Sequence, residues 1–184
     1  ELLEKIKIPP SVTSINDNAF CGCLSLVEIS IQSPIKSIEN DVFNSCISLT
    51  KILIPESVTS IKDNAFYGCS SLIEIKIPHL VTSIGKSAFN ECSMLKKITI
   101  PKSVEFIGGG AFSFCSSLQQ ITFESPSQIT SIESFTFSFC GSLMHINIPS
   151  SVTSIGEYSF QFCGSLNEIT LFINNGAKLE NLLV

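Results

Sequence analysis

The sequence predicts a solenoid of short parallel β-strands joined by short helical or 3₁₀ turns, because it repeats itself every 23 residues. Phenylalanine, cysteine and leucine return at this spacing in three series that stay in register through seven copies. One step in each series is 25 residues, since two extra residues lie in the segment 123–129. The phenylalanine series is Phe20, Phe43, Phe66, Phe89, Phe112, Phe137 and Phe160; the cysteine series is Cys23, Cys46, Cys69, Cys92, Cys115, Cys140 and Cys163.

Each copy contains a strand of the pattern Leu-x-x-Ile-x-Ile, in which apolar and polar residues alternate. This alternation is typical of a half-buried strand. Proline ends the strand because it cannot donate the next ladder hydrogen bond, and the segment Ser-Val-Thr-Ser-Ile that follows is predicted to be a second short extended piece. The prolines are Pro55, Pro78, Pro101 and Pro149.

The segment Ala-Phe-x-x-Cys completes the copy and places apolar residues three apart. This spacing predicts a helix or 3₁₀ segment of one to two turns. Asp17, Asn40, Asp63 and Ser134 stand just before it and are suited to be its N-caps.

A single copy cannot bury its own apolar face, whereas stacked copies can. We therefore expect residues 1–171 to form one solenoid domain whose first repeat is partial. Residues 172–184, with the sequence FINNGAKLENLLV, leave the consensus and are predicted to be a degenerate C-terminal cap or tail.

The full pattern LxxIxIPxSVTSIxxxAFxxCxSL resembles the BspA-like, or treponemal-type, leucine-rich repeats over about residues 2–171. The resemblance implies a leucine-rich-repeat solenoid of the α/β class, without catalysis or cofactor. It also implies frequent display on the surface of bacteria or protozoa, and some members are associated with attachment to host matrix proteins or to other cells.

Composition excludes several classes of function. The chain has a net charge of −5 and its eleven basic residues are all lysine, which argues against nucleic-acid binding. No run of 18 apolar residues is present to span a membrane. His79 and His145 are 66 residues apart, and the chain lacks a Gly-x-Ser-x-Gly elbow or a Cys-x-x-Cys metal pair. We therefore expect no enzyme, no metal and no cofactor.

Neighbouring cysteines of the ladder point in parallel, which is unsuited to a disulfide torsion near 90°. The ladder is predicted to consist of buried, unreactive thiols, with Cys21 as an exposed exception.

One exposed strand position alternates in charge from copy to copy, as in a ladder of cross-strand neighbours: Lys5, Glu28, Lys51, Glu74, Lys97, Gln120, His145 and Glu168. We interpret this ladder as a structural device that fixes the stacking register, with a ligand groove as the alternative. His145 enters it beside Glu168 as a surface histidine, and His79 lies in a turn with no functional signal.

Function is expected where the copies differ. Residues 103–184 carry one lysine and six glutamates, and they gather extra aromatic residues at positions that are small or polar in earlier copies. These residues form a candidate partner-binding site or dimer face, unless the rings fill an outer core or cover a loop. The candidate residues are Phe106, Phe114, Phe135, Phe139, Tyr158, Phe162, Glu105, Glu133 and Glu157.

The leading hypothesis is therefore a non-catalytic protein-binding module at the cell surface or outside the cell, such as the ectodomain of an attachment antigen with a host matrix or cell-surface protein as ligand. The absence of an Asn-x-Ser/Thr glycosylation site and the eight cysteines weigh against it. An intracellular, cytoplasmic scaffold or adaptor is the alternative, and a homotypic assembly element that forms a homo-oligomer is the third hypothesis.

Overall fold

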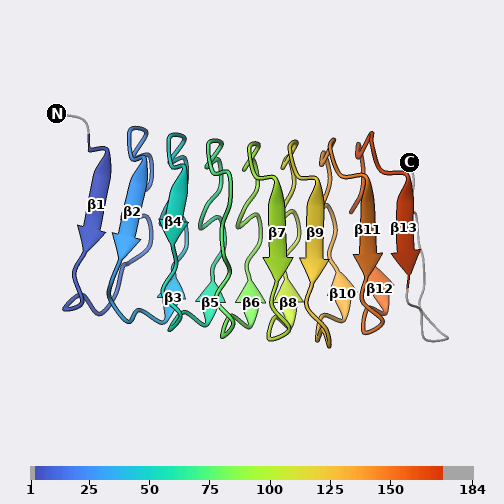
Figure 1. The fold of residues 1–184 in the computed structure, drawn as a ribbon, viewed down its shortest axis with the longest axis horizontal. Coiled ribbons are helices and arrows are strands. Elements are labelled where there is room, and N and C mark those ends of the chain that lie inside the picture. The colour runs from blue at the N-terminus through green and yellow to red at the C-terminus, as the bar shows by residue number, and fades with distance from the viewer. Residues whose placement is uncertain (1–2, 172–184) are drawn as a thin grey trace.

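Each 23-residue repeat forms one coil of a solenoid, and the coils stack side by side in a single row (Figure 1). The computed structural model describes residues 3–171. A typical coil runs through a longer strand, a loop, a two-residue strand and a series of turns. The longer strands are β1 (Lys5–Ile8), β2 (Glu28–Ile31), β4 (Lys51–Leu53), β7 (Lys97–Ile100), β9 (Gln120–Phe123), β11 (His145–Ile148) and β13 (Glu168–Leu171). The two-residue strands are β3 (Ser37–Ile38), β5 (Ser60–Ile61), β6 (Ser83–Ile84), β8 (Phe106–Ile107), β10 (Ser131–Ile132) and β12 (Ser154–Ile155).

All strand pairs are parallel, and their register follows the repeat. Lys5 pairs with Glu28 and Ser37 with Ser60, so each residue lies beside its equivalent in the next coil. In the fourth coil the longer strand is reduced to a single bridge between Glu74 and Lys97. The predicted class, a solenoid of short parallel strands, is confirmed.

The core is a set of ladders that run the length of the solenoid. Rings of consecutive repeats stack with centroids 5.2–5.7 Å apart, and the five central phenylalanines are fully buried. The leucine and isoleucine series flank them, which makes one continuous apolar cluster. Because each coil supplies the same side chains, each buries the apolar face of its neighbours.

The prediction of a short helix at Ala-Phe-x-x-Cys is wrong. No helix forms among residues 3–171, and this segment is a run of tight turns. Two residues in every one of these turns have φ between +51° and +70°, which interrupts a helix. The N–H of Phe20 donates to the carbonyl of Val42 in the next coil, and that of Phe66 to Ala88. Alternate N–H groups of the turns therefore donate to the next coil, while those between them, such as Cys21 N–H to Asn18, donate within the same coil.

Three of the four predicted N-caps, Asp17, Asn40 and Asp63, act between coils as well. Asp17 Oδ1 accepts the backbone N–H of Asn40, and Asn40 Oδ1 accepts that of Asp63. Asp63 Oδ1 continues the series with the N–H of Lys86 at 2.7 Å. These side chains thus satisfy backbone donors of the following repeat, a role equivalent to capping but directed along the solenoid axis.

The cysteine ladder lies in the core, as predicted. Cys46, Cys69, Cys92, Cys115 and Cys140 are buried, while Cys21 is exposed. Each ladder thiol from Cys46 to Cys163 donates to the carbonyl of a phenylalanine in the preceding coil, as Cys69 Sγ does to Phe43 at 3.1 Å. Desolvation by burial raises the pKa of Cys115 to about 12.

The predicted cap or tail at 172–184 lies outside the described residues. Within residues 3–171, no helix exists that is long and apolar enough to cross a membrane.

Burial divides the thiols into two reactivity classes, which a labelling experiment measures. At pH 8, we expect a maleimide to modify Cys21 rapidly in the native protein and to leave Cys69, Cys92 and Cys115 unmodified, because the thiolate is the reactive form. Denaturation should expose all eight cysteines, read as mass increments. Rapid native labelling of Cys92 would contradict the buried ladder.

Candidate partner-binding surface

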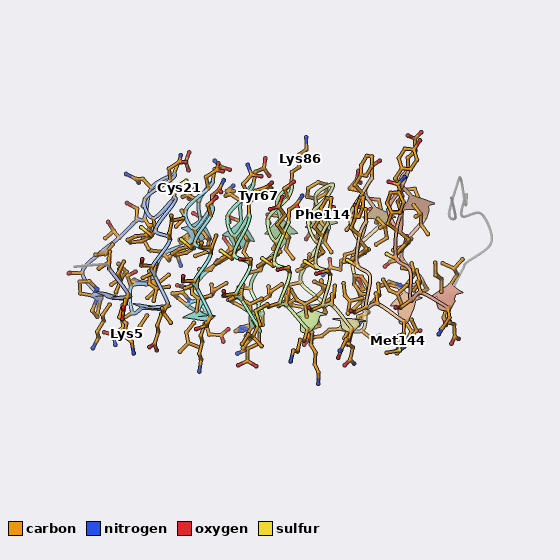
Figure 2. All side chains as sticks on the ribbon, turned by 90° about the horizontal axis from the view of Figure 1, so that it is seen from above. Lys5, Cys21, Tyr67, Lys86, Phe114 and Met144 are labelled. Atoms are coloured by element: carbon orange, nitrogen blue, oxygen red, sulfur yellow. The ribbon has the colours of Figure 1, made fainter. Side chains whose placement is uncertain are left out.

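The solenoid has two opposite sides. We call the side of the longer strands the strand face and the side of the turns, from residues 17–22 to their equivalents 157–162, the turn face. Figure 2 shows Cys21, Tyr67, Lys86 and Phe114 on one side, and Lys5 and Met144 on the opposite side.

The predicted charge ladder runs along the strand face. Lys5 pairs with Glu28, Glu28 with Lys51, and His145 with Glu168, each in strand register. Lys5 Nζ lies 3.3 Å from Glu28 Oε2, and both side chains are more than half exposed. Exposed pairs of this kind stabilise a fold by at most about 1 kcal/mol, which agrees with a role in register.

Sequence reasoning missed a contact at His79. His79 Nδ1 lies 2.9 Å from Glu56 Oε2, and Lys76 Nζ lies 2.6 Å from Glu56 Oε1. The pKa of Glu56 is lowered mainly by the hydrogen bond from Lys76, and to a smaller extent by the hydrogen bond from His79. The sequence could have revealed this contact, because Glu56 and His79 are separated by one repeat of 23 residues and therefore occupy equivalent positions in adjacent coils.

The extra aromatic residues of the last three coils lie on the surface. Phe106, Phe114, Phe135 and Tyr158 are each 43–45% exposed, Phe162 is 63% exposed, and Phe139 is half-buried between its neighbours. These fractions contradict the interpretation that the rings fill an outer core.

Five of the six rings form two rows on the turn face. In one row, Phe114 and Phe139 stack with centroids 4.1 Å apart and planes 8° apart, and Phe162 follows Phe139 at 4.6 Å. In the other row, Phe135 and Tyr158 stack at 5.2 Å. We call these five residues the aromatic rows. Because the rings stack along the solenoid axis, neighbours cover most ring faces and the ring edges remain open to solvent.

The aromatic rows occupy the two left-handed positions of each turn. Their φ angles lie between +56° and +59°, a conformation that is an outlier for bulky residues and costs about 1–2 kcal/mol each. The equivalent positions in the earlier coils hold residues that mostly tolerate it: Asn18, Asp41, Asn64, Ser87 and Gly110 in one row, and Gly22, Ser45, Gly68 and Glu91 in the other.

The repeat imposes the left-handed conformation on both positions in every coil, whatever residue occupies them. A glycine or asparagine would adopt the same φ at lower cost. Residues held in such conformations cluster at functional sites. The aromatic rows are therefore the strongest candidate for a binding surface on this solenoid.

The predicted acidic residues are placed unequally. Glu157 is exposed directly before Tyr158, whereas Glu133 is half-buried and accepts a hydrogen bond from Ser131 Oγ at 2.7 Å. Glu105 and Phe106 belong to the β8 segment, and Phe106 stacks with no other ring among residues 3–171. Glu133 and Glu157 thus lie within two residues of Phe135 and Tyr158 in the chain, whereas Glu105 and Phe106 belong to a different segment of the coil.

Known proteins with this architecture identify the family. The BspA type leucine-rich repeat region matches residues 2–118 and 82–181, in six copies. The chain belongs to the BspA-type leucine-rich repeat family. The family resemblance expected from the sequence is confirmed, and leucine-rich repeat domains generally bind other proteins. No curated protein matches the chain.

Solved structures share the BspA-type fold. A leucine-rich repeat protein from Bacteroides ovatus is 34% identical over 90% of this chain, with a TM-score of 0.83, and this chain spans 45% of its length. The leucine-rich repeat protein of T. pallidum is 26% identical over 91% of this chain and 79% of its own, with a TM-score of 0.81. The pneumococcal vaccine antigen PcpA, 21% identical over 95% of this chain and 41% of its own, has a TM-score of 0.63 and shows only the common fold.

Phe135 and Phe137 are two residues apart, but Phe137 lies in the core and Phe135 on the surface. Phe137→Ala should lower the free energy of unfolding by about 3–5 kcal/mol, because the ring is fully buried. Phe135→Asn should change it by less than about 1 kcal/mol, since relief of left-handed strain offsets the lost ring pair. Urea unfolding followed by circular dichroism measures both values. Comparable destabilisation by the two substitutions would show that Phe135 is structural.

Proposed function

We propose that this chain is a protein-binding module of a surface-displayed antigen that attaches to host cells or matrix proteins through the aromatic rows. One observation carries the proposal: five aromatic residues on consecutive coils hold unfavourable backbone conformations and expose their rings in two stacked rows. Exposed aromatic clusters of this kind are typical of protein interfaces.

Membership of the BspA-type family supports the attachment role, because some members of that family are associated with attachment. The cysteine content is compatible with an oxidising compartment. Five of the ladder thiols are buried and point along parallel directions, so oxidation would reach Cys21 first.

The first test is where the protein is displayed. Antibodies raised against the chain should label intact, unpermeabilised source cells. Labelling that appears only after permeabilisation would contradict the surface role and favour an intracellular scaffold built on the same repeats.

The second test concerns the surface itself. The triple variant Phe114→Ser, Phe139→Ser and Phe162→Ser should remain folded and bind host cells or immobilised matrix proteins about tenfold or more weakly than the wild type, since truncated aromatic anchors cost this much at interfaces. Flow cytometry and plate binding measure the loss.

The matched control removes exposed apolar side chains from the opposite face. Leu53 and Met144 are 62% and 52% exposed, so Leu53→Ser with Met144→Ser should leave binding unchanged. Equal loss in the control and the triple variant, or no loss in a folded triple variant, would contradict the proposed role of the aromatic rows.

A further inference from the structure

We infer that the aromatic rows bind a basic polypeptide segment that carries apolar side chains between its lysines or arginines. This inference rests on the proposed function of the surface and adds the chemistry of its partner. The observations that carry it are the charge of the last coils, the position of individual carboxylates, and the way in which the rings stack.

The charge of the solenoid changes sharply along its axis. Residues 3–102 contain ten lysines and nine acidic residues, which nearly cancel. Residues 103–171 contain five glutamates and no lysine or arginine. The coils that carry the aromatic rows are therefore uniformly acidic, and a basic partner would be attracted and oriented by them.

Carboxylates also occupy positions next to the rings along the chain or along the rows. Glu157 precedes Tyr158, Glu133 lies two residues before Phe135, and Glu91 occupies the position next to Phe114 in its row. Tyr67 Oη of the preceding coil donates to Glu91 Oε1 at 2.6 Å, so this carboxylate is held at the end of the row that Phe114 begins. Successive coils are separated by about 5 Å, so these charges act on a bound segment within one Debye length of about 8–10 Å.

Because the rings stack, a partner can reach the ring edges more easily than the faces between the rings. The Phe114 and Phe139 rings stack with centroids 4.1 Å apart, and Phe162 lies against Phe139 at 4.6 Å with its plane tilted by 34°. A cation or a sugar ring that binds an aromatic residue uses its face, and the faces between stacked rings are closed to it. Aliphatic side chains can pack on the exposed ring edges instead, while basic groups pair with the glutamates. A peptide with both aliphatic and basic side chains can therefore contact the ring edges and the glutamates at the same time.

A second copy of this chain is a less suitable occupant. Its last three coils are acidic and would repel the same surface, and its first 102 residues offer almost no net positive charge. A separate basic protein therefore fits the surface better than self-association.

Three synthetic peptides test the inference directly. Each has twelve residues with leucine at alternate positions, and the remaining positions hold serine with four lysines, four glutamates or only serine. Fluorescence anisotropy with the purified chain should give at least tenfold tighter binding of the lysine peptide than of the glutamate peptide. Raising the salt from about 50 to about 500 mM should weaken the lysine peptide most.

Variants assign the effect to the surface. Glu133→Gln with Glu157→Gln should weaken the lysine peptide about tenfold, and the triple serine variant of Phe114, Phe139 and Phe162 should weaken it as much or more. Glu28→Gln with Glu74→Gln removes two carboxylates of the strand face and should have no effect. Equal binding of the three peptides, no binding of any, or dimerisation that the triple variant abolishes would overturn the inference.

The two proposals can fail separately. Cell or matrix attachment that the triple variant loses but the Glu133/Glu157 variant keeps would overturn the basic partner and leave the attachment role intact. Selective binding of the lysine peptide by a chain that attaches to neither cells nor matrix would do the reverse.

Discussion

Hydrogen bonding between coils at a fixed register is the constraint on which this structure depends. Alternate backbone N–H groups of the turns, such as that of Phe66, point along the solenoid axis and find their acceptors one repeat away. Thr59 and Thr82 add side-chain bonds to carbonyls of the preceding coil. Because a buried backbone donor without a partner is costly, every coil must present the same backbone at the same place. The copied phenylalanines and cysteines follow from that requirement.

The repeat period was sufficient to predict the strands, their parallel register and the core ladders, because these depend only on which residues are equivalent. The period could not predict the local path of the turns. The apolar spacing of Ala-Phe-x-x-Cys fits a helix equally well, and only the sign of φ decides between helix and turns. The contact of His79 with Glu56 was accessible from their separation of one repeat, but a comparison of equivalent turn residues was needed to find it.

The exposure of the aromatic rows follows from the same two φ angles. Side chains at the left-handed positions on either side of each core phenylalanine lie at the tips of the turn, and those of the last three coils are exposed or half-buried. A phenylalanine in the sequence does not predict positive φ, because phenylalanine rarely adopts the left-handed conformation. The sign lies in the earlier coils, where Asn18, Asn64, Gly22 and Gly68 occupy the same rows and are residue types that favour positive φ. Equivalence between repeats thus carries information about conformation that a single repeat lacks.

The two-residue insertion at 123–129 leaves the turn face regular. Among the described residues, β8 and β10 belong to different sheets, as do β9 and β11, and a cavity of about 440 Å³ opens between the loops 123–127 and 147–151. The turns remain bonded across this step, with Phe112 N donating to Thr136 O at 2.9 Å and the Phe114 and Phe139 rings 4.1 Å apart. The insertion therefore interrupts the sheets on the strand side. The turn face keeps the regular spacing between coils that a row of stacked rings requires.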